Sequence, residues 1–291
     1  MTSARVAILT PDPSDRDYHS RWRSVLERTS APLRAAGLAV DGRSWAETED
    51  LAAFDLVLPL LVWGYYRAAP AWRAATEQWE REGIRLRNPP SVLRWNADKS
   101  YLARLAACGA PVTPSLFVER VDEQALAEAA RSLGSNQLIA KPRASASAWQ
   151  TIRWSPGATL DGGPTGPAMI QPFLPAIESE GELSLIYLGG VFSHAIRKRP
   201  QPGDFRVQPE YDGIIDTHQP AADELAAAEA ILAEVEEDLL YARIDLVRGL
   251  DGSPVLMELE LVEPDLYLEH DLSGGAAFAE AIIGALPESA P

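Results

Sequence analysis

Cysteine, long apolar runs and a targeting segment are almost absent from this sequence of 291 residues. The one cysteine, Cys108, cannot form a disulfide within the chain, which excludes a small scaffold held together by disulfide bonds. The longest apolar run, residues 56–63, is far shorter than the roughly 20 residues that a helix needs to span a bilayer. No apolar stretch follows a basic start at the N-terminus, as it would in a signal peptide. These absences predict a cytoplasmic protein without a membrane partner.

Lysine is scarce. Only three of the 26 basic residues are lysines, namely Lys99, Lys141 and Lys198, and the others are arginines. A GC-rich genome, which encodes Arg wherever either cation serves, explains the bias. The remaining lysines are then expected where a compact, flexible point charge is needed and a planar guanidinium does not fit. A surface position left by accident is the alternative for each of them.

Positive charge is also low, with 26 basic residues against 42 acidic ones and a net charge of −16. Nucleic acid is excluded as a partner, because its binding requires many cationic contacts with phosphates. An anionic small molecule can still bind in a pocket where the few cations or a metal ion offset the negative field. The positions of the cations are therefore informative.

Several common sites are missing. There is no Gly-rich loop ending in Gly-Lys-Ser/Thr, no Gly-x-Gly-x-x-Gly and no nucleophile elbow. The four histidines lack the spacing of metal ligands: His19, His194, His218 and His270. These absences argue against a P-loop enzyme, a dinucleotide-binding motif, an α/β-hydrolase and a histidine metal centre.

Strands and helices alternate at the start of the chain. Apolar runs at residues 6–9 and 55–62 predict strands, and apolar residues at helical spacing predict helices over residues 20–36 and 70–82. This order favours a parallel sheet with helices on both faces. Pro89-Pro90 then marks a boundary. The remaining pattern predicts helices at 91–107, 122–133, 220–238 and 273–286, and strands at 115–119, 137–141, 169–173, 182–187, 191–197, 242–247 and 254–261.

An acidic strand near the end of the chain is the sharpest local signal. The period of two places Glu258 and Glu260 on one face, and Asp245 lies in the preceding apolar strand. The turn at Asp251-Gly252 predicts a hairpin, which would bring the three carboxylates together. Like charges so close need a cation, and ligation by oxygen alone suits magnesium. The alternative is a strand with one face in solvent.

The lysines lie beside features that suit an anion. Lys141 ends an apolar strand and leads into a loop of small residues, 143–148, whose backbone N–H groups can approach phosphate oxygens. Lys198 and Arg206 belong to a basic strand and turn in an otherwise acidic chain. They can neutralise a triphosphate or a developing oxyanion, although a basic surface cluster is the alternative.

Residues 93–270 resemble the ATP-grasp ligases, with the motifs in that family's order. The similar segments are Asn96-Ala97-Asp98-Lys99, Lys141-Pro142, Gln171-Pro172-Phe173-Leu174, Gly181-Glu182 and the acidic strand. The resemblance implies a mixed α/β and α+β protein, in which an ATP-grasp fold follows an N-terminal doubly wound parallel-sheet domain. It implies domains at 1–92, 93–168 and 169–291, with a magnesium site in the last.

The resemblance also implies two cofactors, ATP and Mg²⁺, and a role for each motif. Lys99, Lys141, Ser145 and Ser147 would bind ATP at its phosphates and the purine edge, Gln171, Phe173 and Leu174 would form the hinge at the adenine, and Glu182 would lie near the ribose. Lys198 and Arg206 would be the catalytic cations, and Asp245, Glu258 and Glu260 the magnesium ligands.

Three features depart from the family pattern. Glu260 stands where Asn is commoner, the loop at 143–148 has Ala and Ser where many relatives have Gly, and Arg206 is followed by Val-Gln rather than x-Asn. The chain looks closest to the glutathione synthetase branch and to the O-ureido-serine cyclo-ligases of the cycloserine pathway. The latter likeness depends on Lys-Pro followed by Ser-Ala-Ser, on Gly-Asp-Phe-Arg and on Glu-Leu-Glu-Leu.

The resemblance implies an ATP-dependent ligase that activates a small, amino-acid-like carboxylate as an acyl phosphate. An amine or an internal nucleophile would then attack. A small-molecule kinase and a non-catalytic nucleotide-binding module are the alternatives. Substrate contacts are expected from the ends of first-domain strands, at residues 10–12 and 63–67, with Arg67 able to pair with a carboxylate. The oligomeric state is open, and a homodimer is one alternative.

Overall fold

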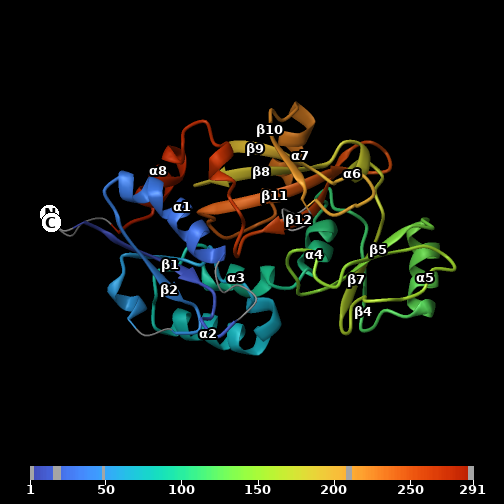
Figure 1. Ribbon diagram of the computed structural model, residues 1–291, viewed down its shortest axis with the longest axis horizontal. Coiled ribbons are helices and arrows are strands. Elements are labelled where there is room, and N and C mark those ends of the chain that lie inside the picture. Colours follow the sequence, from blue (N-terminus) through green and yellow to red (C-terminus); the bar gives the residue numbers. More distant parts are fainter. Residues whose placement is uncertain (1–2, 16–20, 48–49, 208–211, 288–291) are drawn as a thin grey trace.

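The computed structural model describes residues 3–15, 21–47, 50–207 and 212–287. It contains three β-sheets that lie around the middle of the molecule (Figure 1). The N-terminal sheet lies at the lower left of that view, the five-stranded sheet above the centre and the four-stranded sheet at the right. No described helix is both long and apolar enough to cross a membrane.

The N-terminal sheet is parallel, with strand order β2-β1-β3. Its elements are β1 (Arg5–Thr10), α1 (Arg21–Ala35), β2 (Ala39–Ser44), β3 (Leu56–Leu58) and α2 (Ala69–Arg81). Alternate residues of β1 point to opposite faces, so that Val6 packs with Leu33 of α1, whereas Leu9 packs with Trp72 of α2. The predicted parallel sheet covered by helices on both faces is therefore confirmed.

One prediction for this part of the chain was imprecise, and one strand was missed. The apolar run at 55–62 forms only the short strand β3, which ends before Pro59, a residue without an N–H for the sheet. Residues 84–86 contribute only the isolated parallel bridge between Leu86 and Val57. The strand β2 was missed, because its sequence, Ala-Val-Asp-Gly-Arg-Ser, has little apolar character.

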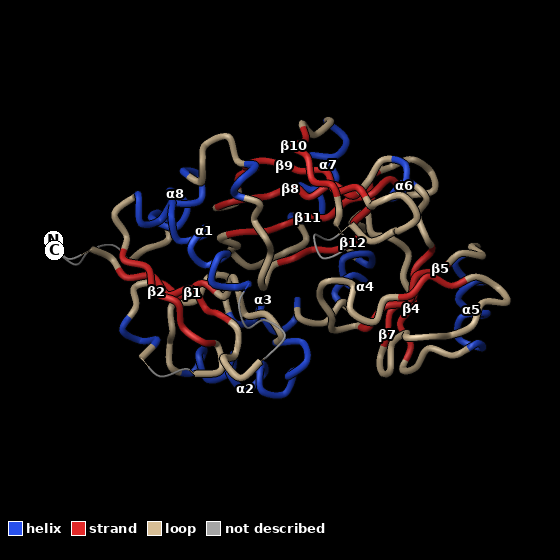
Figure 2. Tube along the Cα trace, in the orientation of Figure 1, coloured by secondary structure: helices blue, strands red, loops and turns tan. Residues whose placement is uncertain are grey.

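The four-stranded sheet is antiparallel, with the order β4-β7-β5-β6. It consists of β4 (Leu116–Val118), β5 (Leu138–Pro142), β6 (Ile152–Trp154) and β7 (Ala168–Pro172), with α5 (Glu123–Leu133) between β4 and β5. Leu126 of α5 packs against Leu138 and Ile170 in a small separate core. Figure 2 shows α5 at the outer edge of this part, so that the opposite face of the sheet is left toward the rest of the molecule.

The five-stranded sheet is antiparallel, with the order β10-β9-β8-β11-β12. Its elements are α6 (Ala176–Ser179), β8 (Glu182–Leu188), β9 (Val191–Arg199), β10 (Ile214–His218), α7 (Ala222–Leu232), β11 (Tyr241–Arg248) and β12 (Pro254–Glu260). The chain ends in α8 (Ala276–Gly284), whose Phe278 shares a buried core with Val6 of β1. Residues from both ends of the sequence therefore pack together.

The predicted single helix at 91–107 is wrong, because the structure has two helices, α3 (Pro90–Asn96) and α4 (Tyr101–Ala107). Between them, the Asp98 carboxylate accepts a hydrogen bond from the Ser100 N–H at 2.9 Å and a bidentate contact from Arg143 at 3.1 and 2.9 Å. The Lys99 N–H donates to the Arg143 carbonyl at 2.8 Å. The break therefore fixes Lys99 against the small-residue loop, residues 143–148.

Two buried asparagines connect this segment to the β11–β12 hairpin. Asn96 donates to the Leu259 carbonyl at 2.8 Å and accepts from the Leu261 N–H at 2.9 Å. Asn88 donates to the carbonyls of Tyr241 and Leu261 and accepts from the Leu240 N–H. Since buried backbone groups need partners, these side chains hold the acidic strand in position.

Candidate active site

A cleft of about 260 Å³ lies between the three sheets. Its walls include α1, the segment after β3, the ends of β5 and β7, and the cleft-facing residues of β11 and β12. Every residue assigned from the sequence to ATP, to magnesium or to catalysis lines this cleft. The structure therefore brings together side chains that are more than 150 residues apart in the sequence.

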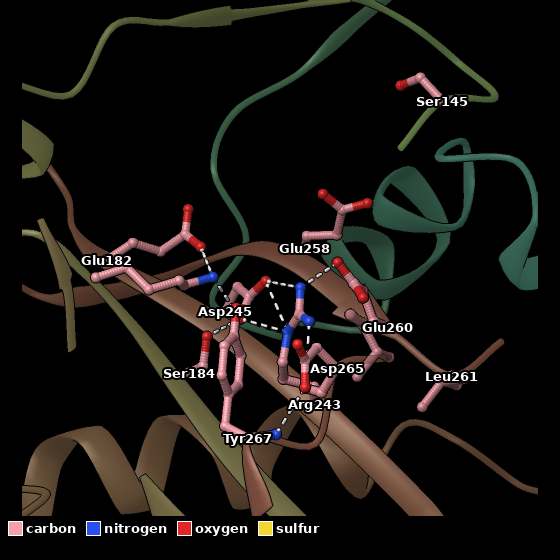
Figure 3. Close-up of polar contacts among 12 residues, drawn as sticks. Ser145, Glu182, Ser184, Arg243, Asp245, Glu258, Glu260, Leu261, Asp265 and Tyr267 are labelled. Carbon is pink, nitrogen blue, oxygen red and sulfur yellow. Dashed lines mark hydrogen bonds and ion pairs between the residues drawn. The ribbon is translucent and has the colours of Figure 1, made fainter. Parts of the chain in front are cut away.

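The hairpin places the acidic residues as expected. In the register of β11 and β12, Asp245 lies opposite Glu258, and Arg243 lies opposite Glu260. The register shifts directly after Asp245, at a β-bulge. All three carboxylates belong to the cleft wall, and Figure 3 shows Asp245 and Glu260 in contact with the guanidinium of Arg243, with Glu258 apart from it. The period of two was thus sufficient to predict which acids share a face.

Arg243 is a charged residue of the cleft wall that the sequence argument did not assign. Its Nε lies 3.1 Å from Asp245 Oδ1, its second terminal nitrogen lies 2.9 Å from Asp245 Oδ2, and it also pairs with Glu260. Burial opposes the charge of Arg243, but Asp245 and Glu260 outweigh it and raise the pKa of the guanidinium. The signal was present in Arg243-Ile244-Asp245, since residues two apart in a strand point to the same face.

Lys198 lies in the same buried network. It is opposite Glu182 in the register of β8 and β9, pairs with that carboxylate, and its Nζ lies 3.4 Å from Asp245 Oδ1. Burial acts against its charge, but Asp245 and Glu182 outweigh burial and raise the pKa of Lys198. Burial also disfavours the charge on Asp245, yet Arg243 and Lys198 lower the pKa of Asp245 to about 2. This group is therefore a fixed anion between two fixed cations.

Lys99 and Lys141 approach the acids from the other side of the cleft. Lys99 Nζ lies 3.0 Å from Glu258 Oε1 and donates to the Ser145 carbonyl at 2.5 Å. Burial opposes ionisation of Glu258, but Lys99 and Lys141 outweigh it and lower the pKa of this carboxyl. Burial, assisted by Lys99, lowers the pKa of Lys141, which forms no ion pair with any described residue. Lys141 is thus a cation in the cleft wall that is available for an anionic ligand.

The small-residue loop lines the same side of the cleft as Lys99 and Lys141. The Ser145 hydroxyl donates to the Pro142 carbonyl at 3.2 Å, and Ser147 and Ala148 have φ angles of 49° and 55°. Such left-handed backbone is the conformation that glycine adopts most easily. Residues 147 and 148 therefore have a backbone conformation that favours glycine, although the loop contains no glycine.

The hinge, residues 171–174, lines the far end of the cleft. Gln171 donates from Nε2 to the Ser115 hydroxyl at 2.9 Å, while its buried Oε1 has no hydrogen-bond partner among the described residues. The Phe173 N–H donates to the Gln137 carbonyl at 2.8 Å, so it is already used within the protein. The side-chain oxygen of Gln171 is therefore the free acceptor of this wall.

Two of the predicted cations, Arg206 and Arg67, pair with aspartates outside the acidic hairpin. Arg206 lines the cleft but contacts Asp204 through Nε at 3.0 Å and a terminal nitrogen at 2.7 Å. The Arg206 contact lowers the pKa of Asp204 to about 2. Gln208, which follows this turn, lies outside the described residues. Arg67 pairs with Asp15 and is not part of the cleft wall, whereas its neighbours Trp63 and Tyr65 are.

The residues present fit magnesium in their donor chemistry. Asp245, Glu258 and Glu260 supply oxygen ligands alone, which is what this ion prefers. However, each of these carboxylates pairs with Lys99, Lys198 or Arg243, and no group of three His, Cys, Asp or Glu residues in the described part of the chain is arranged around a metal position. The carboxylate oxygens that could bind magnesium are therefore assembled in the cleft, but each carboxylate is paired with a lysine or arginine of the protein.

Comparisons with known proteins agree with this geometry. Residues 6–88 match the family described as the N-terminal domain of the D-cycloserine synthetase DcsG. The chain is 31% identical over 274 residues to cycloserine biosynthesis protein DcsG of Streptomyces lavendulae, covering 86% of this chain and 89% of the relative. It is 28% identical over 281 residues to glutathione synthetase of Prochlorococcus marinus (strain MIT 9313), covering 90% and 85%.

Solved structures give the same result. The crystal structure of D-cycloserine synthetase DcsG superposes with a TM-score of 0.81 at 26% identity, covering 98% of this chain and 100% of the other. D-alanine–D-alanine ligase from Bacillus anthracis has a TM-score of 0.65 at 16% identity, covering 98% and 96%, and shows the likeness of fold alone. The chain belongs to the ATP-grasp ligase family. It is an ATP-dependent ligase, and the predicted ATP-grasp fold is confirmed.

Proposed function

We propose that this ligase activates the carboxylate of a small, amino-acid-like molecule as an acyl phosphate, in a reaction that requires magnesium. An amine or a nucleophile within the same molecule then displaces phosphate. The observation that carries the proposal is the buried network in which Asp245 lies between Lys198 and Arg243 inside the cleft. A site that moves a phosphoryl group needs such preorganised charges of both signs.

ATP would lie with its base at the hinge and its phosphates under the small-residue loop. The free Oε1 of Gln171 can accept a hydrogen bond from the exocyclic amine of adenine, beside Phe173 and Leu174. Lys141, which has no ion-pair partner among the described residues, together with Lys99 and the serines of the loop, would bind the phosphates. Glu182, assigned to the ribose from the sequence, pairs with Lys198 and would have to exchange that contact.

Magnesium would be held by Asp245, Glu258 and Glu260, and it would supply a Lewis acid at the phosphate oxygens. In the protein alone, Lys99 neutralises Glu258 and Arg243 neutralises Glu260. Phosphate oxygens offer both cations an alternative partner, because charge-assisted contacts to phosphate are strong. Lys99 would then contact ATP, and the carboxylate of Glu258 would be available as a magnesium ligand.

The residues around Asp245 would act on the transferred group. A carboxylate oxygen of the substrate attacks the γ-phosphorus, and the bond to the β-phosphate oxygen breaks to release ADP. The nucleophile then attacks the carbonyl carbon and phosphate leaves. Lys198 and Arg243 would neutralise the oxyanions of both steps, with Arg206 as a third cation at the edge of the cleft. Closure of the small-residue loop would exclude water from the acyl phosphate.

An internal nucleophile would make the enzyme a cyclo-ligase. The similarity to proteins named for cycloserine biosynthesis supports this possibility over that of joining two molecules. The predicted cytoplasmic location and homodimer are separate predictions, and size-exclusion chromatography with light scattering would test the second.

Phosphorus NMR of the protein with MgATP and pooled amino acids, hydroxy acids and ureido or hydroxamate derivatives would test the proposed function. We expect ADP and free phosphate that depend on the pool, and division of the pool would identify the substrate. A persistent phosphate ester would instead identify a small-molecule kinase. Unchanged ATP with every pool would contradict ligation of these carboxylates.

A further inference from the structure

The cleft is larger than the region assigned to ATP. Beyond β12 it continues along residues 263–269, which face α1 and the carboxyl end of the N-terminal parallel sheet. Leu60, Leu61 and Trp63 line this extension from the sheet side. Ligands bind at such strand ends in open α/β sheets, so the extension is the place for the second substrate.

Glu263 is the carboxylate of this extension that lacks a partner. Its Oε2 is buried and has no hydrogen-bond partner in the described part of the chain, although the residue belongs to the cleft wall. The neighbouring acids, Asp265 and Glu269, do have partners. Asp265 accepts from the Tyr267 N–H at 3.0 Å, and Glu269 lies 3.7 Å from Arg28. Because a buried polar atom without a partner is unfavourable, the position of Glu263 suits a ligand that donates a hydrogen bond.

The surroundings of Glu263 indicate what kind of donor fits. Burial, and after it the charge of Glu260, raises the pKa of Glu263. Burial followed by the charge of Glu263 likewise raises the pKa of the Tyr65 phenol across the cleft. A cationic donor beside Glu263 would offset both effects and favour the charged carboxylate, which a neutral donor does less well.

We infer that Glu263 binds the amino group of the substrate, which is therefore a carboxylate that carries an ammonium group close to the reacting centre. This inference depends on the proposed ligase function. Glu263 follows Glu260 by three residues, so the ammonium site lies next to the proposed magnesium ligands. An amino group on the carbon next to the carboxylate is the substrate arrangement that would place both groups at these adjacent residues. Glu263 thus selects the substrate and does not take part in phosphoryl transfer.

Pairs of substrates test the inference on the unaltered protein. ADP release with MgATP would be measured for each D- and L-amino acid and for its deaminated counterpart, in which hydrogen replaces the amino group. We expect release only with the amine-bearing member of an active pair. Equal turnover of the two members would overturn the inference but leave the ligase function standing. No release with any carboxylate would overturn both.

The variant Glu263→Gln tests the residue itself. It keeps the shape of the side chain but removes the charge, so we expect KM for the active amino acid to rise about 10- to 100-fold. The KM for ATP and the MgADP-induced shift in melting temperature should stay at their wild-type values. Glu128→Gln, which makes the same change at an exposed acid of α5 outside the cleft, is the control and should leave all of these values unchanged. An unchanged KM for the amino acid in Glu263→Gln would overturn the assignment.

Discussion

Lys99 Nζ lies 3.0 Å from Glu258 Oε1, so a proposed phosphate ligand and a proposed magnesium ligand neutralise each other in the ligand-free protein. The same lysine also holds the Ser145 carbonyl and thereby the small-residue loop. Arg243 likewise neutralises two proposed magnesium ligands, Asp245 and Glu260. Nucleotide and metal binding would therefore exchange internal ion pairs for ligand contacts, without leaving buried charges unpaired at any stage.

Lys141→Arg should weaken ATP binding although it conserves charge. Lys141 lies in the cleft wall near the buried residues Ala140 and Ser145 and has no ion pair with a described residue, so the wider guanidinium would not fit. We expect KM for ATP to rise by about tenfold or more in steady-state ADP release. Arg131→Lys, on the exposed surface of α5, is the control and should behave as wild type. Wild-type KM in Lys141→Arg would contradict the argument from scarce lysine.

Arg243→Lys should lower kcat by about 100-fold, because an ammonium group cannot make the bidentate contact with Asp245 while also reaching Glu260. Arg243→Met should also destabilise the fold by about 3 kcal/mol, since it leaves buried carboxylates without their cation. Thermal unfolding and single-turnover kinetics would measure the two effects. Full activity in Arg243→Lys would show that Arg243 has only a structural role.

Asp245 should contribute to stability above about pH 4 and lose that contribution as the pH falls further. Its pKa is lowered to about 2 in the folded protein, so the unfolded chain takes up the proton first. The loss between about pH 4 and about pH 2 should reach about 2 kcal/mol. Urea unfolding without magnesium would show a smaller pH dependence in Asp245→Asn than in wild type. An equal acid dependence would contradict this assignment.

Ala148→Gly should stabilise the protein by about 1 kcal/mol, because Ala148 has a left-handed backbone that costs alanine more than glycine. Ala146→Gly is the matched control in the same loop, at a residue without that backbone, and should destabilise. Differential scanning calorimetry would show opposite shifts in melting temperature. A lower melting temperature in both variants would mean that the left-handed backbone at Ala148 costs alanine nothing.

Much of the fold followed from local patterns. The alternation of apolar strands and helices was sufficient for the parallel sheet, and the turn at Asp251-Gly252 with a period of two was sufficient for the acidic hairpin. The helix expected at 91–107 was wrong because its interruption depends on Arg143, which is 45 residues from Asp98. The spacing of apolar residues in a helix gives no information about a contact with a residue so distant in the sequence.

The sequence alone determined which residues carry charge, which strands bear them and which face each side chain takes, because these follow from residue type and from the two-residue period of a strand. Only the tertiary structure decided which cation neutralises which carboxylate. The pairing of Lys198 with Asp245 needs the β8–β11 neighbourhood, and that of Lys99 with Glu258 needs the break between α3 and α4. Tertiary structure also left the Oε2 atom of Glu263 buried without a hydrogen-bond partner among the described residues, since burial and pairing arise from contacts between distant segments.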